Sequence, residues 1–292
     1  MTDYLDDLFD IIDDVEAEKE EVKWSRGAFS MIGGKTKSLK HIIPELPITK
    51  DTVWVDHCAG TGVVSFNIKP GKINVINDRY SAITDFYLSI RDHFDEFITY
   101  LERFPWHSRQ QWVESHKKWN KHSDPVRRAA HWFYYWRSSV LGKGKYFGRG
   151  LTYPFNPMKD VFELLPSIRD KLRLFTLENL DIRKCIEDYD SLNTVHYIDT
   201  PYVNTDQGTY AHKWTEKDMK SLLNLLAGCK GFVALSHIPY DLIDEQDFWT
   251  DKKVWDVVYT AEPKIAKEGN YKTQVDGNMN QFECLWIKEA SA

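Results

Sequence analysis

Seven short and almost continuously apolar segments recur along this chain, with stretches of helical periodicity between them. The apolar segments are residues 53–57, 73–77, 172–177, 194–199, 232–236, 254–260 and 282–287. Several lack the alternation of a strand with one solvated face, so we expect strands covered on both faces. Intervening segments such as EKDMKSLLNLLAGC at 216–229 have the spacing of amphipathic helices. The pattern predicts an α/β fold with a mostly parallel, seven-stranded, Rossmann-like sheet.

The alternation breaks over residues 91–171, which we interpret as an insertion between two parts of the sheet domain, 23–90 and 172–292. Residues 103–159 hold twelve Lys or Arg, two acidic residues and thirteen aromatic residues. Basic side chains neutralise phosphates, and aromatic rings stack on exposed bases, so the insertion is a candidate nucleic-acid surface. Four aromatic residues are expected mainly in its core: Trp132, Phe133, Tyr135 and Trp136. Four basic residues near flexible glycines are the candidate nucleic-acid contacts: Arg137, Lys143, Lys145 and Arg149.

The net charge of −6 hides a strong segregation of charge. Residues 1–22 hold ten acidic residues and one lysine, whereas the rest of the chain has 37 basic and 34 acidic residues. Apolar residues at helical spacing in this acidic extension favour a short amphipathic helix. It is either a solvated extension or a segment that docks on a protein partner or masks charge.

Composition also argues against several classes of protein. No segment approaches the roughly 18 apolar residues of a membrane helix, and the acidic start of the chain lacks the features of a signal peptide. The four cysteines (Cys58, Cys185, Cys229 and Cys284) are scattered, without a Cys-x-x-Cys pair. We therefore expect a cytoplasmic protein with reduced thiols, no metal site and no membrane partner.

Three motifs suggest a site for a nucleotide-like ligand. VWVDHCAGTGVVSFN (53–67) runs from a strand through Gly60-Thr61-Gly62 into a predicted helix, whose N-terminal amides would face a ligand. The next strand ends at Asn77-Asp78, where a Rossmann-like site binds ribose; a helix N-cap is the alternative for Asp78. The Gly33-Gly34-Lys35 loop is not a P-loop, because Phe29 stands where that motif needs glycine. It is either a turn or a loop beside a polar ligand.

VHYIDTPYVNT (195–205) ends an apolar run with a carboxylate, a proline and a tyrosine. Ionised Asp199 can accept an amine N–H, and Pro201 favours an extended Thr200 whose carbonyl can do the same. Tyr202 offers a flat face for stacking. Two acceptors beside a ring suit an exocyclic amino group on a heteroaromatic base. A strand stop and turn would explain Pro201, but not all three features.

In this order, over roughly residues 25–290, the motifs resemble those of the D12 class of N6-adenine-specific DNA methyltransferases (Dam-like). GGK at 33–35 and DHCAGTG at 56–62 resemble its cofactor motifs, and DTPY at 199–202 resembles its catalytic DPPY tetrapeptide. The resemblance implies a class I methyltransferase fold, S-adenosylmethionine as cofactor and double-stranded DNA as substrate. It also implies that 91–171 recognises the target, that 23–90 and 172–292 form the catalytic domain, and that the enzyme works in a bacterial or phage-infected cell, where restriction-modification is a common setting.

The resemblance carries specific residues with it. The implied cofactor-binding residues are Met31, Gly33, Gly34, Lys35, Asp56, Cys58, Gly60, Thr61, Gly62, Asp78, Asp181 and Ile182. The implied catalytic residues are Asp199, Thr200, Pro201 and Tyr202. Met31 and Ile182 stand where the family often has an aromatic residue, and Thr200 replaces the first proline of DPPY. Because the acceptor at that position is a backbone carbonyl, Thr200 loses proline's φ restraint but keeps the acceptor.

The implied reaction transfers a methyl group from the cofactor to N6 of an adenine flipped out of the duplex. Cytosine-C5 methylation requires a cysteine nucleophile, typically after a proline, and no cysteine here follows a proline. Cytosine-N4 methylation uses nearly the same polar cup and stays an alternative. RNA methylation and a non-catalytic DNA-binding or decoy protein of the same fold are further alternatives.

Overall fold

The computed structural model describes residues 23–142, 144–149, 158, 160–205, 207–208, 212–259, 272–275 and 278–291. The acidic extension 1–22, with its predicted helix, and Lys143 lie outside the described residues. No helix in the described ranges is both long and apolar enough to span a membrane.

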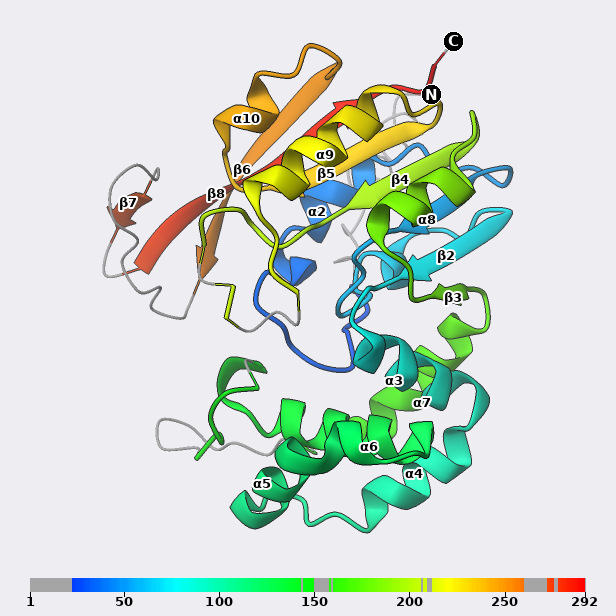
Figure 1. Ribbon diagram of the computed structural model, residues 1–292, viewed down its shortest axis with the longest axis vertical. Coiled ribbons are helices and arrows are strands. Elements are labelled where there is room, and N and C mark those ends of the chain that lie inside the picture. Colours follow the sequence, from blue (N-terminus) through cyan, green and yellow to red (C-terminus); the bar gives the residue numbers. More distant parts are fainter. Residues whose placement is uncertain are drawn as a thin grey trace, which may run out of the picture.

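A single twisted sheet organises the chain (Figure 1). Its strands are β1 (Val53–Asp56), β2 (Ile73–Asn77), β3 (Thr176–Glu178), β4 (Thr194–Ile198), β5 (Phe232–His237), β6 (Asp251–Tyr259), β7 (Lys272–Val275) and β8 (Asn278–Lys288). Seven of them follow the order β3-β2-β1-β4-β5-β8-β6, and the short β7 pairs with β8. The first five are parallel, and β8 is antiparallel to its neighbours. The predicted α/β fold with a mostly parallel Rossmann-like sheet is confirmed.

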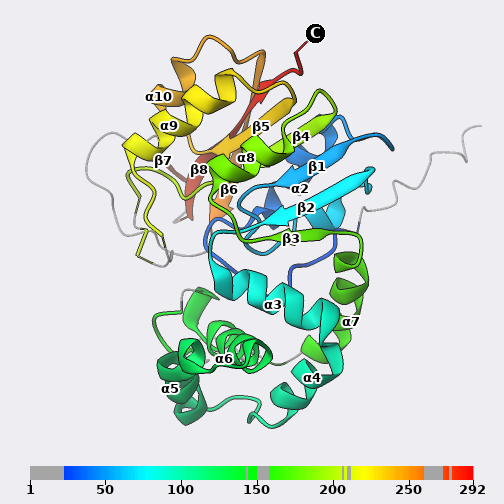
Figure 2. The ribbon, with the colours of Figure 1, turned by 45° about the vertical axis from the view of Figure 1, so that its right-hand side comes forward.

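Helices cover both faces of the sheet and extend beyond the edge formed by β3 (Figure 2). The α-helices are α2 (Leu39–Ile42), α3 (Ser81–Asp92), α4 (Phe94–Glu102), α5 (Arg109–Lys118), α6 (Pro125–Arg137), α7 (Val161–Leu172), α8 (Ile182–Tyr189), α9 (Glu216–Ala227) and α10 (Asp241–Asp244). Five 3-10 turns are also described: η1 (Lys35–Lys37), η2 (Ile43–Glu45), η3 (Ser65–Asn67), η4 (Trp119–Lys121) and η5 (Val140–Gly142). We call α4, α5 and α6 the helical lobe. The predicted insertion limits, 91 and 171, fall inside α3 and α7 and stay predictions.

Two element predictions differ from the structure. The apolar run 172–177 was expected to be a strand, but Leu172 ends α7 and β3 begins at Thr176. Leu172 continues the buried helical stripe of Val161, Leu165 and Ile168, so its apolar character belongs to the helix. A helix was expected after the glycine turn, but only the 3-10 turn η3 forms there. The chain becomes extended at Ile68, two residues before Pro70.

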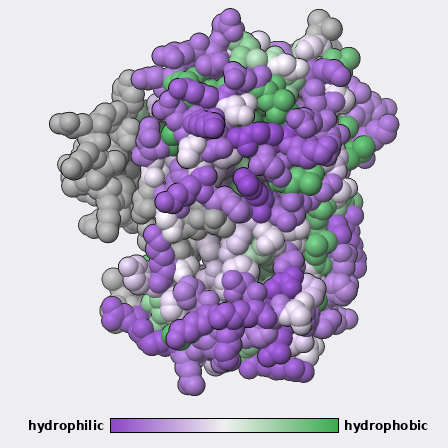
Figure 3. Space-filling model, in the orientation of Figure 1, coloured by the Kyte–Doolittle hydropathy of each residue, from purple (hydrophilic) through white to green (hydrophobic). Residues whose placement is uncertain are grey.

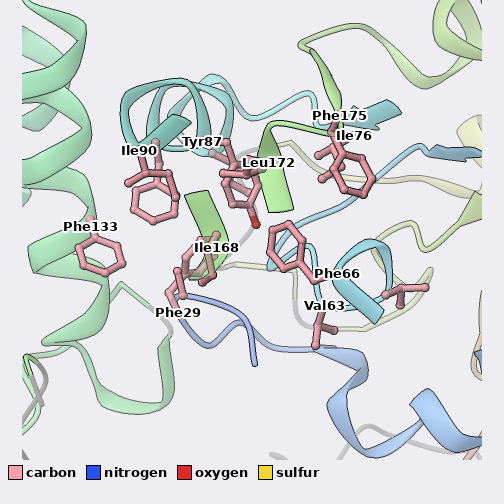
Figure 4. Close-up of a cluster of buried hydrophobic side chains, with 14 of the residues drawn as sticks. Phe29, Val63, Phe66, Ile76, Tyr87, Ile90, Phe133, Ile168, Leu172 and Phe175 are labelled. Atoms are coloured by element: carbon pink, nitrogen blue, oxygen red, sulfur yellow. The ribbon is translucent and has the colours of Figure 1, made fainter. Parts of the chain in front are cut away.

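An aromatic core fastens the helical lobe to the sheet (Figure 4). The rings of Phe86 on α3 and Phe133 on α6 stack 4.7 Å apart, centre to centre. Phe29, from the segment before the sheet, meets Trp132 edge-on at 5.1 Å. The four aromatic residues expected in the core are buried, with exposed fractions of 5% or less: Trp132, Phe133, Tyr135 and Trp136. On the other face of the sheet, α9 buries Met219, Leu222 and Leu226.

Candidate active site

The carboxyl ends of the parallel strands β1, β2 and β4 open into one pocket, the position at which open α/β sheets bind ligands. It is completed by the loop before η1 and by the start of α8. Of the predicted cofactor residues, the pocket is lined by Met31, Gly33, Gly34, Lys35, Asp56, Cys58, Gly60, Thr61, Asp78, Asp181 and Ile182. It is also lined by Asp199, Thr200, Pro201 and Tyr202. The sequence motifs therefore converge on one pocket. Gly62 does not itself line it, but its neighbours Thr61 and Val63 do.

The glycine turn after β1 is held in shape by Asp78 at the end of β2. Gly60 and Gly62 have φ of +51° and +67°, a region that other residues rarely adopt. The N–H of Gly60 donates to Asp78 Oδ2 at 2.9 Å, and the N–H of Tyr80 donates to Oδ1 at 2.8 Å. Burial raises the pKa of Asp78 to about 6, partly opposed by these two hydrogen bonds. The carboxylate keeps lone pairs for ligand hydroxyls.

Asp56 ends β1 at the back of the pocket and is 1% exposed. Its Oδ2 accepts from the Ser65 hydroxyl at 2.8 Å, while its buried Oδ1 has no hydrogen-bond partner within the described part of the chain. Burial raises the pKa of this carboxyl to about 8, and the nearby Asp199 and Asp78 add to the effect. A buried carboxyl oxygen without a partner, on a residue that lines the pocket, fits a ligand that forms a hydrogen bond with it.

The DTPY segment follows β4 directly, and Lys35 fixes its carboxylate. The Lys35 ammonium, 2% exposed, donates to Asp199 Oδ1 at 2.7 Å, to the Tyr202 hydroxyl at 2.8 Å and to the Gly33 carbonyl at 2.9 Å. Burial raises the pKa of Asp199 to about 6, although Lys35 pulls it down. Thr200 is buried, and the Tyr202 ring lies 4.7 Å from that of His237. One carboxylate and one aromatic ring thus lie at the same end of the pocket.

Asp181, which lines the pocket, interacts with two neighbouring arginines. It caps α8 by accepting from the Arg183 N–H at 3.0 Å, and its Oδ2 lies 3.1 Å from the Arg79 guanidinium. Neither Arg79 nor the buried Trp214, which also lines the pocket, was identified from the sequence. Arg79 directly follows Asp78, and that adjacency was the available signal. Trp214 lies between the DTPY segment and α9, and no sequence signal marked it as a pocket residue.

The four candidate DNA contacts have different environments. Lys145 and Arg149 are exposed near the isolated bridge that joins Ser139 to Phe147. Arg137 is instead turned inward: it donates to the Ala28 carbonyl at 2.6 Å and lies 5.8 Å from the Phe133 ring centre. Burial lowers the pKa of Arg137 to about 10. Its geometry favours a structural role, joining the lobe to the sheet domain.

One cluster of potential metal ligands is found in the described residues: Asp190, His196 and Cys229. The Asp190 carboxylate accepts the N–H groups of Lys230 and Gly231, each at 3.0 Å, and His196 lies between Asp190 and His57. These bonds tie the loop before β5 to β4. The cluster is thus accounted for as a loop anchor.

The fold and the site define a Rossmann-like methyltransferase: a glycine turn after β1, an acid after β2 and a DTPY acceptor after β4 around one pocket. The family model of the D12 class N6 adenine-specific DNA methyltransferases matches residues 31–255, and the chain belongs to this family. Comparison with curated proteins gives no match. Family membership supports DNA adenine methylation as the general activity.

Proposed function

We propose that this protein transfers a methyl group from S-adenosylmethionine to N6 of an adenine flipped out of double-stranded DNA. One observation carries the proposal: Asp199 and Tyr202 line the same pocket as Asp78 and the glycine turn. A methyl donor on the glycine-turn side and an amino acceptor at the DTPY side would therefore meet inside one enclosure. Bringing the two reactants together in this way is the main contribution that a protein makes to such a transfer.

The residues at the back of the pocket fit the proposed cofactor. Asp78 would accept ribose hydroxyls with its remaining lone pairs, and the unpartnered Oδ1 of Asp56 would form another hydrogen bond with the cofactor. The positive-φ glycine turn lets the backbone approach the ligand closely. S-adenosylmethionine, when bound, supplies an activated methyl group.

At the other end of the pocket, Asp199 would hold the target amine. Lys35 occupies Oδ1 of this carboxylate at 2.7 Å, and Oδ2 would accept from the base. The adjacent ammonium also favours the ionised carboxylate, the only form in which both oxygens are acceptors. The Thr200 carbonyl would take the second amine hydrogen, and the Tyr202 ring would stack on the flipped base.

The proposed substrate also accounts for the charge of the insertion. A base must leave the helix to reach the pocket, and the surrounding duplex then needs a surface that binds phosphates. Exposed Lys145 and Arg149 supply positive charge, and Lys143 stays a proposed contact. Trp106 and Tyr146, which are 61% and 73% exposed, add aromatic surface that the sequence did not separate from the core aromatics.

The direct test is transfer from S-adenosylmethionine with a labelled methyl group, followed by nucleoside analysis of the product. Duplex DNA, single-stranded DNA and RNA of identical sequence are compared, and we expect N6-methyladenine mainly in the duplex. Label in N4-methylcytosine or in RNA would replace the proposed substrate by that alternative. Failure of the chain to bind the cofactor would instead favour a non-catalytic DNA-binding protein.

A further inference from the structure

Glu283 is a buried carboxylate that none of the motifs includes. It lies in the middle of β8, opposite Trp255 on β6, with 1% of its side chain exposed. It also lies beyond residues 31–255, which match the family model. A carboxylate is rarely buried unless it is paired, so its partners indicate what it does.

The partners of Glu283 lead directly to the active site. Oε1 accepts from the Tyr202 hydroxyl at 3.2 Å and lies 4.0 Å from the Lys35 ammonium. Oε2 accepts from the Ser38 hydroxyl, just beyond η1, at 2.5 Å. The carboxylate therefore joins the C-terminal strand to the DTPY segment and to the end of the GGK loop.

The direction of the hydrogen bonds to Glu283 follows from the groups that donate to Ser38 and to Tyr202. The indole N–H of Trp255 can only donate, and it donates to Ser38 Oγ at 3.1 Å, so the Ser38 hydrogen is directed to Glu283. The ammonium of Lys35 can only donate as well, and its bond to the Tyr202 hydroxyl leaves that hydrogen for Glu283. Both oxygens of Glu283 thus act as acceptors, as in an ionised carboxylate.

This network connects Glu283 to the acceptor carboxylate. The Lys35 ammonium donates to Asp199, Tyr202 and the Gly33 carbonyl. Because Glu283 holds the Tyr202 hydroxyl, it fixes one of these three acceptors. A change at Glu283 would therefore alter both the tilt of the Tyr202 ring and the position of Lys35 against Asp199.

We propose that Glu283 is a positioning residue for methyl transfer, which holds Tyr202 and Lys35 in the arrangement that presents Asp199 to the target amine. The inference rests on the proposed function. Glu283 does not itself line the pocket, so it would act only through Tyr202 and Lys35, which do.

The test compares Glu283→Gln with Glu289→Gln, the same chemical change at an exposed position just after β8. Glu283→Gln keeps the shape of the side chain but removes its charge. We expect the single-turnover methylation rate to fall about tenfold or more, with Kd for cofactor and for DNA within about twofold of wild type. Glu289→Gln should match wild type. A wild-type rate in Glu283→Gln would overturn the inference while leaving the proposed function intact.

A double-mutant cycle separates positioning from a general structural effect. If Glu283 acts through Tyr202, the combined Glu283→Gln/Tyr202→Phe variant should be little slower than Tyr202→Phe alone. Independent, multiplied effects would contradict the proposal. If Glu283→Gln does not fold, Tyr202→Phe cuts the same bond from the other end, and full activity in it would be equally decisive. An inactive wild-type chain that binds cofactor and duplex would refute the proposed function itself.

Discussion

Three buried carboxyl groups share the pocket, and their surroundings divide them into different protonation states. Burial raises the pKa of Asp56 to about 8, and those of Asp78 and Asp199 to about 6. Near neutral pH, Asp78 and Asp199 are therefore mostly ionised, while Asp56 is mostly protonated. Lys35 offsets the charge of Asp199, and Asp78 has only N–H donors. The remaining negative charge suits the sulfonium of the proposed cofactor.

At the scale of one residue, Asp199→Ala should remove transfer without removing the cofactor. The variant loses the carboxylate that is proposed to hold the amine, but the glycine turn and Asp78 remain. We expect the single-turnover rate to drop at least about 100-fold, with Kd for S-adenosylmethionine nearly unchanged. Asp247→Ala, at an exposed position, is the control. Substantial transfer by Asp199→Ala would show that the amine is held elsewhere.

The raised pKa of Asp199 predicts an acid limit on activity. Only the ionised carboxylate accepts from both Lys35 and the amine, so the rate should fall as pH decreases through about 6. The ordinary aspartate pKa of 3.8 would place this limit about two units lower. Single-turnover rates at saturating cofactor and DNA measure it, because saturation removes the effect of Asp78 on binding. A single-turnover rate that stays unchanged as the pH is lowered to 4.5 would contradict this role for Asp199.

Which site residues the sequence could predict depends on where their partners lie. Asp78 and Asp199 follow parallel strands directly, so the sheet alone brings them to one edge. Glu283 meets Tyr202 from a position 81 residues away, on a strand whose antiparallel pairing was not predicted. A glutamate within an apolar run was the available signal. For Arg137 the sequence suggested a contact with DNA because the residue is basic. In the structure its guanidinium donates to the Ala28 carbonyl instead, a partner that the sequence does not reveal.

At the scale of the element, the glycine turn is held in a conformation that excludes a side chain. A Cβ atom added to Gly62 would lie 2.8 Å from the ring of Phe66 and 3.0 Å from the Tyr87 hydroxyl. The same tyrosine donates to the Gly60 carbonyl at 2.8 Å, so the turn is packed from behind by α3. The wall of the pocket is thereby shaped by core packing beneath it.

Gly62→Ala should therefore destabilise the protein and weaken cofactor binding together. The positive φ and the close contacts predict a loss in free energy of unfolding on the order of 1–3 kcal/mol. Urea unfolding and cofactor titration measure the two effects. Gly228→Ala is a matched control, since its φ is −92° and its Cβ would lie at ordinary van der Waals distance, 3.6 Å, from the Leu225 carbonyl oxygen. Equal stability of the two variants would contradict the steric argument.

The strands were the most predictable elements, because a sheet covered on both faces leaves continuous apolar runs. The boundary between α7 and β3 was not predictable in this way, since the helix ends on Leu172 and the strand begins four residues later. Apolar residues of both elements form one run in the sequence. The turn η3 shows a similar limit: a glycine turn after a strand usually precedes a helix, but here only three residues follow in 3-10 geometry.

At the scale of the whole molecule, charge is distributed unequally along the chain. Hydrophilic residues cover most of the face shown in Figure 3, on the helical lobe as well as around the sheet. The stretch 103–159 nonetheless has ten more basic than acidic residues, whereas the chain as a whole has a net charge of −6. We therefore expect DNA to be attracted mainly to this basic stretch. Its charge would then orient the bound DNA as well as strengthen binding.

The salt dependence of DNA binding tests this arrangement. Log K for duplex binding falls as log salt rises. If Lys145 and Arg149 each neutralise a phosphate, replacing either by alanine should weaken duplex binding and make this negative slope shallower by about one. Lys217→Ala, at an exposed position on α9 in the sheet domain, should change neither quantity. Fluorescence anisotropy with one labelled duplex, over a series of salt concentrations, gives both values. Unchanged slopes in the two insertion variants, or an equal change in Lys217→Ala, would mean that the phosphates are bound elsewhere on the molecule.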